Sequence, residues 1–113
     1  MDCIFCKIIK KEIPANIVYE DEKVIAFHDI NPITPVHILV VPKEHIETLV
    51  EIKESENTLI SHIYQVINKI AKQLKIDEKG FRVIVNCKED GGQVVGHLHF
   101  HLLGGKKLGV KIA

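Results

Sequence analysis

Hydrophobic residues recur along the chain with two spacings, which predict several short strands and one long helix. Apolar or alternating runs at residues 17–19, 24–28, 37–41, 81–85 and 97–103 are typical of strands. Between Ser55 and Leu74, apolar residues recur every three or four positions, as they do on one face of a helix. A shorter stretch at 5–11 is also compatible with a helix. It ends before Ile13-Pro14, because the residue before a proline avoids the helical conformation.

The order of these elements indicates the class of fold. The polar segment 20–23 joins the first two strands as a hairpin, and Pro32 and Pro35 break the chain before the third strand. Strands and helices do not alternate regularly, so the pattern predicts an α+β fold with an antiparallel sheet of about five strands on one long helix. No repeat or linker divides the sequence, and residues 1–113 are expected to form one domain.

Composition narrows the class of protein further. The chain is 46% hydrophobic, and its 15 basic residues balance its 15 acidic residues. A net charge of zero disfavours binding to nucleic acid or to an anionic membrane surface. No apolar run approaches the roughly 20 residues of a transmembrane helix, and the N-terminus lacks the layout of a signal peptide. Two of the three cysteines form a C-x-x-C pair, which favours a reducing, cytoplasmic setting.

Three of the seven histidines alternate with apolar residues near the C-terminus, where residues 96–105 read Gly-His-Leu-His-Phe-His-Leu-Leu-Gly-Gly. Successive side chains of a strand point to opposite faces, so His97, His99 and His101 would line one face while the residues between them enter the core. Any half-buried strand presents a polar row, but three imidazoles together point to chemistry.

Two kinds of site suit such a strand. One is a metal site of three neutral imidazoles, and the other is a nucleophile flanked by helper residues. The spacing of the histidines does not choose between them. Glycine pairs at 91–92 and 104–105 lie on either side, and they leave backbone N–H groups free to approach an anion. This arrangement favours a phosphate ligand and a nucleophilic histidine.

Motifs that carry a resemblance to a known family are spread over nearly the whole chain. They are Cys3-Ile-Phe-Cys-Lys-Ile-Ile9, Glu12-Ile-Pro14, Tyr19-Glu-Asp21, Ala26-Phe-His-Asp-Ile30, Pro35, His37, Pro42-Lys43, His45, and Gly92-Gln93 through Gly105. By these motifs the sequence resembles the histidine triad family, within it the branch of purine nucleoside phosphoramidases. The resemblance implies the histidine triad fold and a homodimer.

The resemblance also implies a covalent mechanism. In this family the middle histidine of the triad, here His99, attacks the α-phosphorus of a purine nucleotide of the AMP or GMP type. Water then hydrolyses the nucleotidyl-histidine. His101 would serve the phosphate and the leaving group, His37 would support the imidazole network, and His97 would complete the catalytic set.

A nucleotide site follows from the same resemblance. Asp29 would accept hydrogen bonds from the ribose hydroxyls, and Asn86, Gln93 and Val95 would contact the phosphate beside His99 and His101. An apolar slot would hold the purine, although each of its members taken alone also suits ordinary core packing. Its residues are Ile4, Phe5, Ile8, Phe27, Ile30 and Leu39. The sequence departs from the family at Val94, where serine is common, and at Lys88, where glycine is common.

Cys3 and Cys6 make only half of a tetrahedral metal site. The resemblance supplies two further ligands, His45 and His97, for a closed Cys2His2 site that would hold a structural Zn²⁺; no catalytic cofactor is implied. The alternative is two thiols packed without a metal. Of the remaining candidates, Cys87 is expected to be a strand-end thiol without a partner, and His62 a solvated residue of the long helix.

The expected activity is hydrolysis of purine nucleoside 5′-phosphoramidates to a nucleoside monophosphate and an amine. Hydrolysis of dinucleoside polyphosphates is an alternative, although the branches that perform it tend to continue with Pro-Arg where this chain has Gly104-Gly105. A second alternative is a nucleotide-binding regulatory module with little or no catalysis, because Val94 removes a hydroxyl from the phosphate site. Zinc storage would leave Asp29 and Asn86 unexplained.

Overall fold

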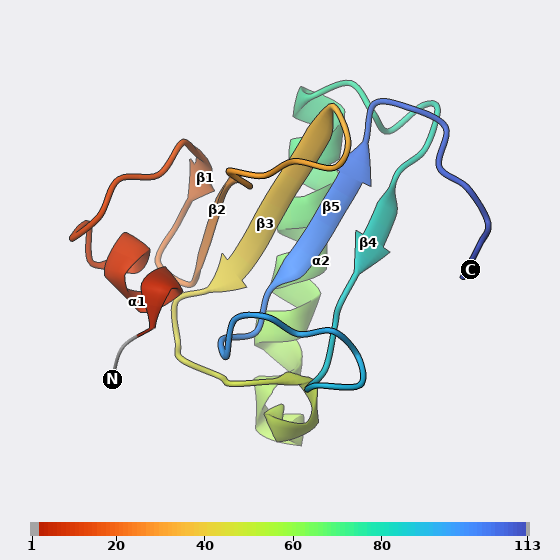
Figure 1. The fold of residues 1–113 in the computed structure, drawn as a ribbon. Coiled ribbons are helices and arrows are strands. Elements are labelled where there is room, and N and C mark those ends of the chain that lie inside the picture. Colours follow the sequence, from red (N-terminus) through yellow and green to blue (C-terminus); the bar gives the residue numbers. More distant parts are fainter. Residues whose placement is uncertain (1–2, 113) are drawn as a thin grey trace.

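The structure is a computed structural model that describes residues 3–112, and it is built on an open five-stranded antiparallel sheet (Figure 1). The strands lie in the order β1-β2-β3-β5-β4. In chain order the elements are α1 (Ile4–Ile9), β1 (Ile17–Glu20), β2 (Val24–His28), β3 (Val36–Pro42), the 3-10 turns η1 (Leu49–Glu51) and η2 (Glu54–Glu56), α2 (Asn57–Gln73), β4 (Arg82–Ile84) and β5 (Phe100–Gly104). The predicted α+β fold with five strands and one long helix is confirmed.

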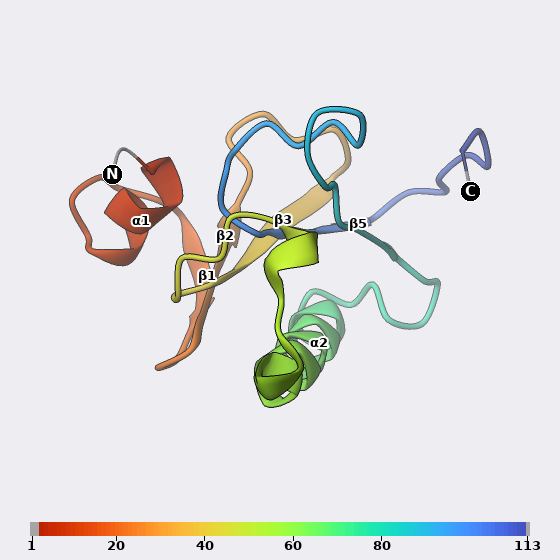
Figure 2. The same cartoon turned by 90° about the horizontal axis from the view of Figure 1, so that it is seen from below.

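Both faces of the central strands are buried, because alternate side chains point to opposite sides of the sheet. One face packs on α2 with Ala26, Ile38, Val40, Phe100 and Leu102 among its buried residues. The other face packs on α1 and buries a second set, which consists of Cys3, Phe5, Ile8, Ile25, Phe27, Leu39 and Val41. Viewed along the sheet, the loops before β3 and before β5 rise on the side away from α2 (Figure 2).

The long helix owes its position to one apolar stripe. Ile63, Val66, Ile67, Ile70 and Ala71 are buried against the sheet, as the spacing predicts. Truncating a fully buried member such as Ile67 to alanine would destabilise the fold by about 2–5 kcal/mol. Within residues 3–112, no helix combines the length and apolar character needed to cross a membrane.

Strand β5 begins at Phe100, three residues later than the sequence predicts. The reason lies in the neighbouring strand β3. The amide of Lys43 bonds the carbonyl of Lys23 on the β2 side, so the preceding residue, Pro42, faces the histidine segment. Proline has no N–H to continue the ladder, and its carbonyl accepts a hydrogen bond from His97 Nε2 instead (2.8 Å).

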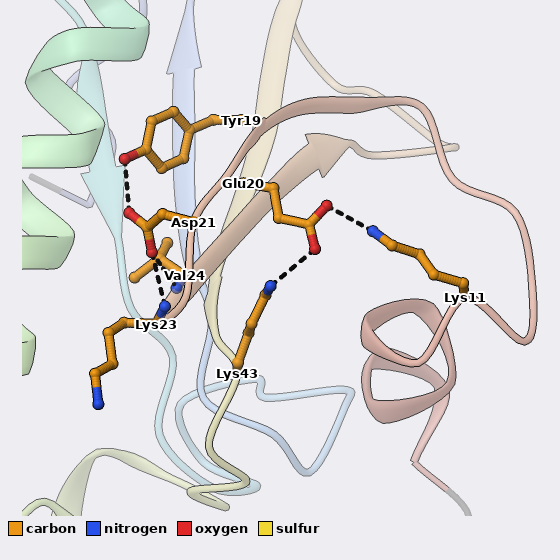
Figure 3. Close-up of polar contacts among 7 residues, drawn as sticks. All are labelled: Lys11, Tyr19, Glu20, Asp21, Lys23, Val24 and Lys43. Atoms are coloured by element: carbon orange, nitrogen blue, oxygen red, sulfur yellow. Dashed lines mark hydrogen bonds and ion pairs between the residues drawn. The ribbon is translucent and has the colours of Figure 1, made fainter.

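Charged residues of the β1–β2 hairpin hold α1 and β3 together (Figure 3). Glu20 accepts hydrogen bonds from Lys11, just after α1, at 2.6 Å and from Lys43, just after β3, at 2.8 Å. Beside it, Asp21 accepts hydrogen bonds from the Tyr19 hydroxyl and from two amides of its own turn. These contacts fix the end of the sheet against which α1 packs.

His62 on α2 reaches the same hairpin, with its Nε2 donating to Asp21 Oδ2 over 2.7 Å. The expectation that His62 is merely solvated is therefore wrong. Burial raises the pKa of Asp21, but its hydrogen-bond donors, the Tyr19 hydroxyl first among them, outweigh this and hold the pKa well below its ordinary value. Asp21 thus stays ionised and joins the hairpin to the long helix.

Candidate functional site

The histidine row lies on the face of the sheet opposite α2. Phe5 of α1 stacks edge-on against His97 and His99, with ring centroids 5.9 and 5.1 Å apart, and His99 lies 5.0 Å from His101. The residues between them, Leu98 and Phe100, and the following Leu102 are buried in the core that contacts α2. The alternation seen in the sequence therefore places three imidazoles side by side, although two of them precede the strand.

The backbone fixes which nitrogen of His99 carries the proton. Nδ1 lies 2.7 Å from the carbonyl oxygen of His97, which can only accept, so Nδ1–H donates to it. The neutral imidazole then keeps its lone pair on Nε2. A ring held in this way is a nucleophile at Nε2, and the carbonyl at Nδ1 stabilises the positive charge that forms when Nε2 attacks.

A second backbone group orients His37 and His101. The amide of Ile33 donates to His37 Nδ1 at 3.2 Å, so the proton of neutral His37 lies on Nε2. That nitrogen is 3.0 Å from His101 Nδ1, which accepts, and the proton of His101 consequently lies on Nε2. His37 Nε2 also lies 3.4 Å from Asp29 Oδ2. We call Asp29, His37 and His101 the carboxylate cluster.

Both imidazoles of the carboxylate cluster are neutral at pH 7. Burial, followed by the neighbouring His99 and His37, lowers the pKa of His101 to about 4, and Asp29 opposes this shift. Burial also lowers the pKa of His37, again against the attraction of Asp29. His101 can therefore present a neutral N–H donor on the same face as His99.

At the other end of the row, His97 joins Cys3, Cys6 and His45, which we call the thiol cluster. Its potential ligand atoms all lie within 4.8 Å of one another. His97 Nδ1 is 3.3 Å from Cys3 Sγ and 3.1 Å from His45 Nδ1, and Cys6 Sγ is 3.2 Å from His45 Nδ1. Because His97 Nε2–H donates to Pro42, its lone pair on Nδ1 points into the cluster.

The chemistry of these donors fits a zinc ion. Two sulfurs and two imidazole nitrogens are a common tetrahedral set for Zn²⁺. The side chain of His45 has its polar contacts inside the cluster, and among the described residues its other nitrogen, Nε2, is buried without a partner. Burial, then the neighbouring Cys3, raises the pKa of the Cys6 thiol, so a thiolate there needs a compensating cation. The thiol cluster could hold a metal ion.

The predicted purine slot is brought together only in part. Phe5, Ile8, Phe27 and Leu39 form one buried cluster, and Val95 packs against it. Leu39 pairs directly with His101 across the sheet, so this apolar cluster adjoins the histidine row. Two members lie outside the cluster: Ile4 is half exposed, and Ile30 is 89% exposed on the loop after β2. Strand alternation does not extend into that loop.

The predicted phosphate contacts lie on the loop before β5. Asn86 and Val95 are half-buried there, and Val94 is 92% exposed. Lys88 adopts a left-handed conformation with φ of 60°, which explains why glycine suits this position. A Cβ on Gly91 would lie 2.5 Å from the Cys87 carbonyl, so the loop closes tightly on itself.

Two residues that hold the site, Thr48 after β3 and Ile33 before β3, gave no signal in the sequence. The buried Thr48 contacts Cys87 Sγ at 3.1 Å and the side chain of Gln93 at 2.7 Å. The expectation that Cys87 lacks a partner is therefore wrong. Ile33 acts through its amide, and its 70% exposed side chain gives no hint of that role. A single threonine or a backbone N–H forms no motif that could have been found.

Fold and site together define a class: a small α+β protein whose open sheet carries a histidine row between a thiol cluster and a carboxylate cluster. The family model described as "HIT domain" matches residues 10–108, so the chain belongs to the histidine triad (HIT) family. The resemblance stated from the sequence is confirmed at this level.

Relatives and solved structures agree with this assignment. The chain is 53% identical to an uncharacterized HIT-like protein of Buchnera aphidicola subsp. Baizongia pistaciae over 93% of this chain and 94% of that protein. It is 60% identical to a histidine triad protein from Clostridium difficile, with a TM-score of 0.94 over 96% and 95% of the two chains. A HIT family hydrolase from Legionella pneumophila Philadelphia 1 is 39% identical, with a TM-score of 0.97 over 99% and 100%.

A further solved structure carries a ligand class in its name. It is a histidine triad nucleotide-binding protein from Candida albicans, 39% identical to this chain with a TM-score of 0.82. The superposition covers 96% of this chain and 82% of the Candida protein.

Proposed function

We propose that the protein is a nucleotide-binding hydrolase that cleaves purine nucleoside 5′-phosphoramidates to a nucleoside monophosphate and an amine. The observation that carries this proposal is the hydrogen bond from His99 Nδ1 to the His97 carbonyl, because it leaves Nε2 free for nucleophilic attack. The names of the Legionella and Candida proteins, a hydrolase and a nucleotide-binding protein, agree with it.

The first half of the reaction breaks the phosphorus–nitrogen bond. His99 Nε2 attacks the α-phosphorus, the phosphorus–nitrogen bond breaks, and the departing nitrogen takes a proton from solvent while His101 Nε2–H donates a hydrogen bond to the leaving group. His37 keeps the His101 proton on Nε2, because its own Nε2–H donates to the His101 Nδ1 lone pair. The product of this step is nucleotidyl-His99, whose imidazolium charge is shared with the His97 carbonyl at Nδ1.

The second half returns the enzyme to its starting state. Water attacks the phosphorus of nucleotidyl-His99 and releases a proton to solvent, while His101 stays neutral with its proton on Nε2. The nucleoside monophosphate leaves, and His99 recovers its Nε2 lone pair. Asp29 would hold the ribose hydroxyls, and the buried cluster of Phe5, Phe27 and Leu39 would support the purine.

The same proposal includes a structural zinc and a homodimer. A Zn²⁺ ion held by Cys3, Cys6, His45 and His97 would stabilise the fold at the start of α1, which carries Phe5 into the site. Pairing of two chains would extend apolar burial for a domain of this size. A reducing cytoplasm suits such a protein, since metal ligation requires the cysteines as thiolates.

The test is release of AMP from adenosine 5′-phosphoramidate by the wild type and by His99→Ala. We expect turnover in the wild type and a loss of at least about a thousandfold in the variant, since the covalent step is removed. His62→Ala is a matched control, because His62 lies on α2 behind the sheet; it should keep its turnover. Mass spectrometry of a quenched reaction should find the adenylyl group on the peptide that contains His99.

The alternatives predict different outcomes. A wild type that binds AMP but releases none from the phosphoramidate would favour a nucleotide-binding module. Val94 supports that alternative, because its 92% exposed side chain offers no hydroxyl to the phosphate. Faster cleavage of diadenosine polyphosphates than of the phosphoramidate would identify the other hydrolase.

A further inference from the structure

The side-chain amide of Gln93 stands at the centre of four hydrogen bonds. Its Oε1 accepts from the Thr48 hydroxyl at 2.7 Å and from the Lys88 amide at 2.9 Å. Its Nε2 donates to the carbonyls of Glu47 at 2.7 Å and Val95 at 2.9 Å. The two carbonyls can only accept, so the orientation of the amide is fixed by its partners. The amide has no hydrogen-bonding position left for a phosphate.

These partners lie on two separate stretches of chain that meet at the histidine row. Glu47 and Thr48 follow His45, and a neighbouring residue, Ile46, accepts the amide of Leu98 at 2.6 Å. Val95 precedes the row, and its carbonyl also accepts the amide of His97 at 2.9 Å. Gln93 therefore fastens the loop before β5 to the stretch after β3 at the point where the histidine row begins.

We propose that Gln93 is a positioning residue that holds the start of the histidine row, and not a phosphate ligand. This inference rests on the proposed function only for its effect on catalysis. Gln93 binds the Val95 carbonyl, Val95 binds the His97 amide, and the His97 carbonyl binds His99 Nδ1. The height of the His99 ring above the sheet is set through this series of contacts.

Thr48 makes the proposal testable, because it is buried and its hydroxyl donates to Gln93 Oε1. Its exposed fraction is 6%, so we expect no direct contact between Thr48 and a nucleotide. Thr48→Val keeps the shape of the side chain and removes the donor to Oε1. If Gln93 is a positioning residue, Thr48→Val and Gln93→Ala should produce the same defect. If Gln93 is a phosphate ligand, Thr48→Val should have no effect.

The primary measurement is amide hydrogen exchange at His97 and Leu98 in the protein without a nucleotide. We expect exchange at both amides to rise roughly tenfold in Gln93→Ala and in Thr48→Val, because the hydrogen bonds that hold this stretch are lost. The double variant should add little to either single variant, since both remove the same contact. Val94→Ala, at an exposed neighbouring position, is the matched control and should leave exchange unchanged.

Catalysis and binding give the second measurement. We expect kcat for adenosine 5′-phosphoramidate to fall about tenfold in both single variants, with AMP affinity within threefold of wild type. Gln93→Glu should do worse than Gln93→Ala, because a carboxylate oxygen would face the carbonyls of Glu47 and Val95.

The outcomes separate this inference from the proposed function. Unchanged exchange in Gln93→Ala, or a loss of AMP affinity of more than tenfold in Gln93→Ala with none in Thr48→Val, would overturn the positioning role. A wild type that fails to hydrolyse the phosphoramidate would overturn the proposed function alone, since amide exchange requires no substrate. If Gln93→Ala fails to fold, Thr48→Val and Val94→Ala still decide between the two roles.

Discussion

The thiol cluster and the carboxylate cluster use neighbouring histidines of one segment and are nonetheless prepared for different chemistry. In the thiol cluster, His97 Nε2–H donates a hydrogen bond to the Pro42 carbonyl, which leaves the Nδ1 lone pair directed toward two sulfurs. In the carboxylate cluster, the Ile33 amide donates a hydrogen bond to His37 Nδ1, which leaves the Nε2 proton directed toward His101. One backbone acceptor prepares a potential metal ligand, and one backbone donor prepares a hydrogen-bond donor.

Distances alone would not reveal this difference. The ligand atoms of Asp29, His37 and His101 also lie within 4.8 Å of one another, as the atoms of a metal site would. Binding a metal at His37 Nε2 would require its proton to move to Nδ1, where it would face the Ile33 N–H. The carboxylate cluster is therefore better suited to hydrogen bonding than to metal ligation.

Removing one sulfur should separate the clusters most clearly. We predict that Cys6→Ser lowers zinc affinity roughly a hundredfold or more, since even changes outside the ligand set cost 10–100-fold. Asp29→Asn should leave the zinc content unchanged. Metal analysis and competition with a chelator measure both variants, and a loss of zinc in Asp29→Asn would break the distinction between the clusters.

At the carboxylate cluster, His37→Ala should weaken the hydrogen bond from His101 to the leaving group and leave the zinc content unchanged. We expect kcat to fall roughly 10–100-fold for substrates with a basic alkylamine leaving group, because His101 loses its partner at Nδ1. The loss should shrink for an aromatic amine, which departs with less need of a proton. Equal losses for both kinds of amine would show that His37 does not act through His101.

Acid should weaken the fold through the same buried imidazoles. The pKa of His101 is lowered to about 4 and that of His37 is also lowered, whereas the unfolded chain protonates near its ordinary value of 6.5. Between about pH 6.5 and 4 the unfolded state therefore binds more protons, so stability is full above 6.5 and falls as the pH is lowered.

Urea unfolding at several pH values in the presence of a chelator measures this effect. Each such histidine contributes at most about 1.4 kcal/mol per pH unit within the window. His101→Gln should flatten the dependence, and an unchanged slope would place the effect elsewhere in the molecule.

The smallest effect is expected at Val94, on the exposed loop before β5. Val94→Ser introduces a hydroxyl at the proposed phosphate site, and we predict an increase in kcat of up to about tenfold. Because Val94 is 92% exposed, its substitution should change the free energy of unfolding by less than about 0.5 kcal/mol. Unchanged kcat would mean that the phosphate is held without help from this position.

Sequence patterns predicted the elements of the fold, and the family resemblance named the four members of the thiol cluster, but neither predicted how the two clusters are held. Alternation placed Leu98 and Phe100 in the core, and the three-four spacing placed Ile63 and Ile67 on the sheet. These are local rules that a periodic pattern expresses. The contact between His97 and the Pro42 carbonyl joins residues 55 positions apart and depends on the path of the backbone.

The same limit explains why the placement of two expected site residues could not be predicted. Ile30 follows the end of β2, where strand parity no longer determines the direction of a side chain, and it is 89% exposed. Gln93 matched a motif position, but the motif does not show that Thr48 and Glu47 would occupy its amide. Motifs identify which residues matter, and three-dimensional contacts decide what each can bind.

Control of imidazole tautomers by Pro42, His97 and Ile33 through their main-chain atoms has an evolutionary consequence. Main-chain carbonyls and amides are present whatever side chain is encoded, apart from the amide that proline lacks. Point mutations around the site can therefore accumulate without altering where its protons reside. Descendants of such a protein are free to change the shape of the substrate site, and so the substrates they accept, while they inherit the same protonation pattern.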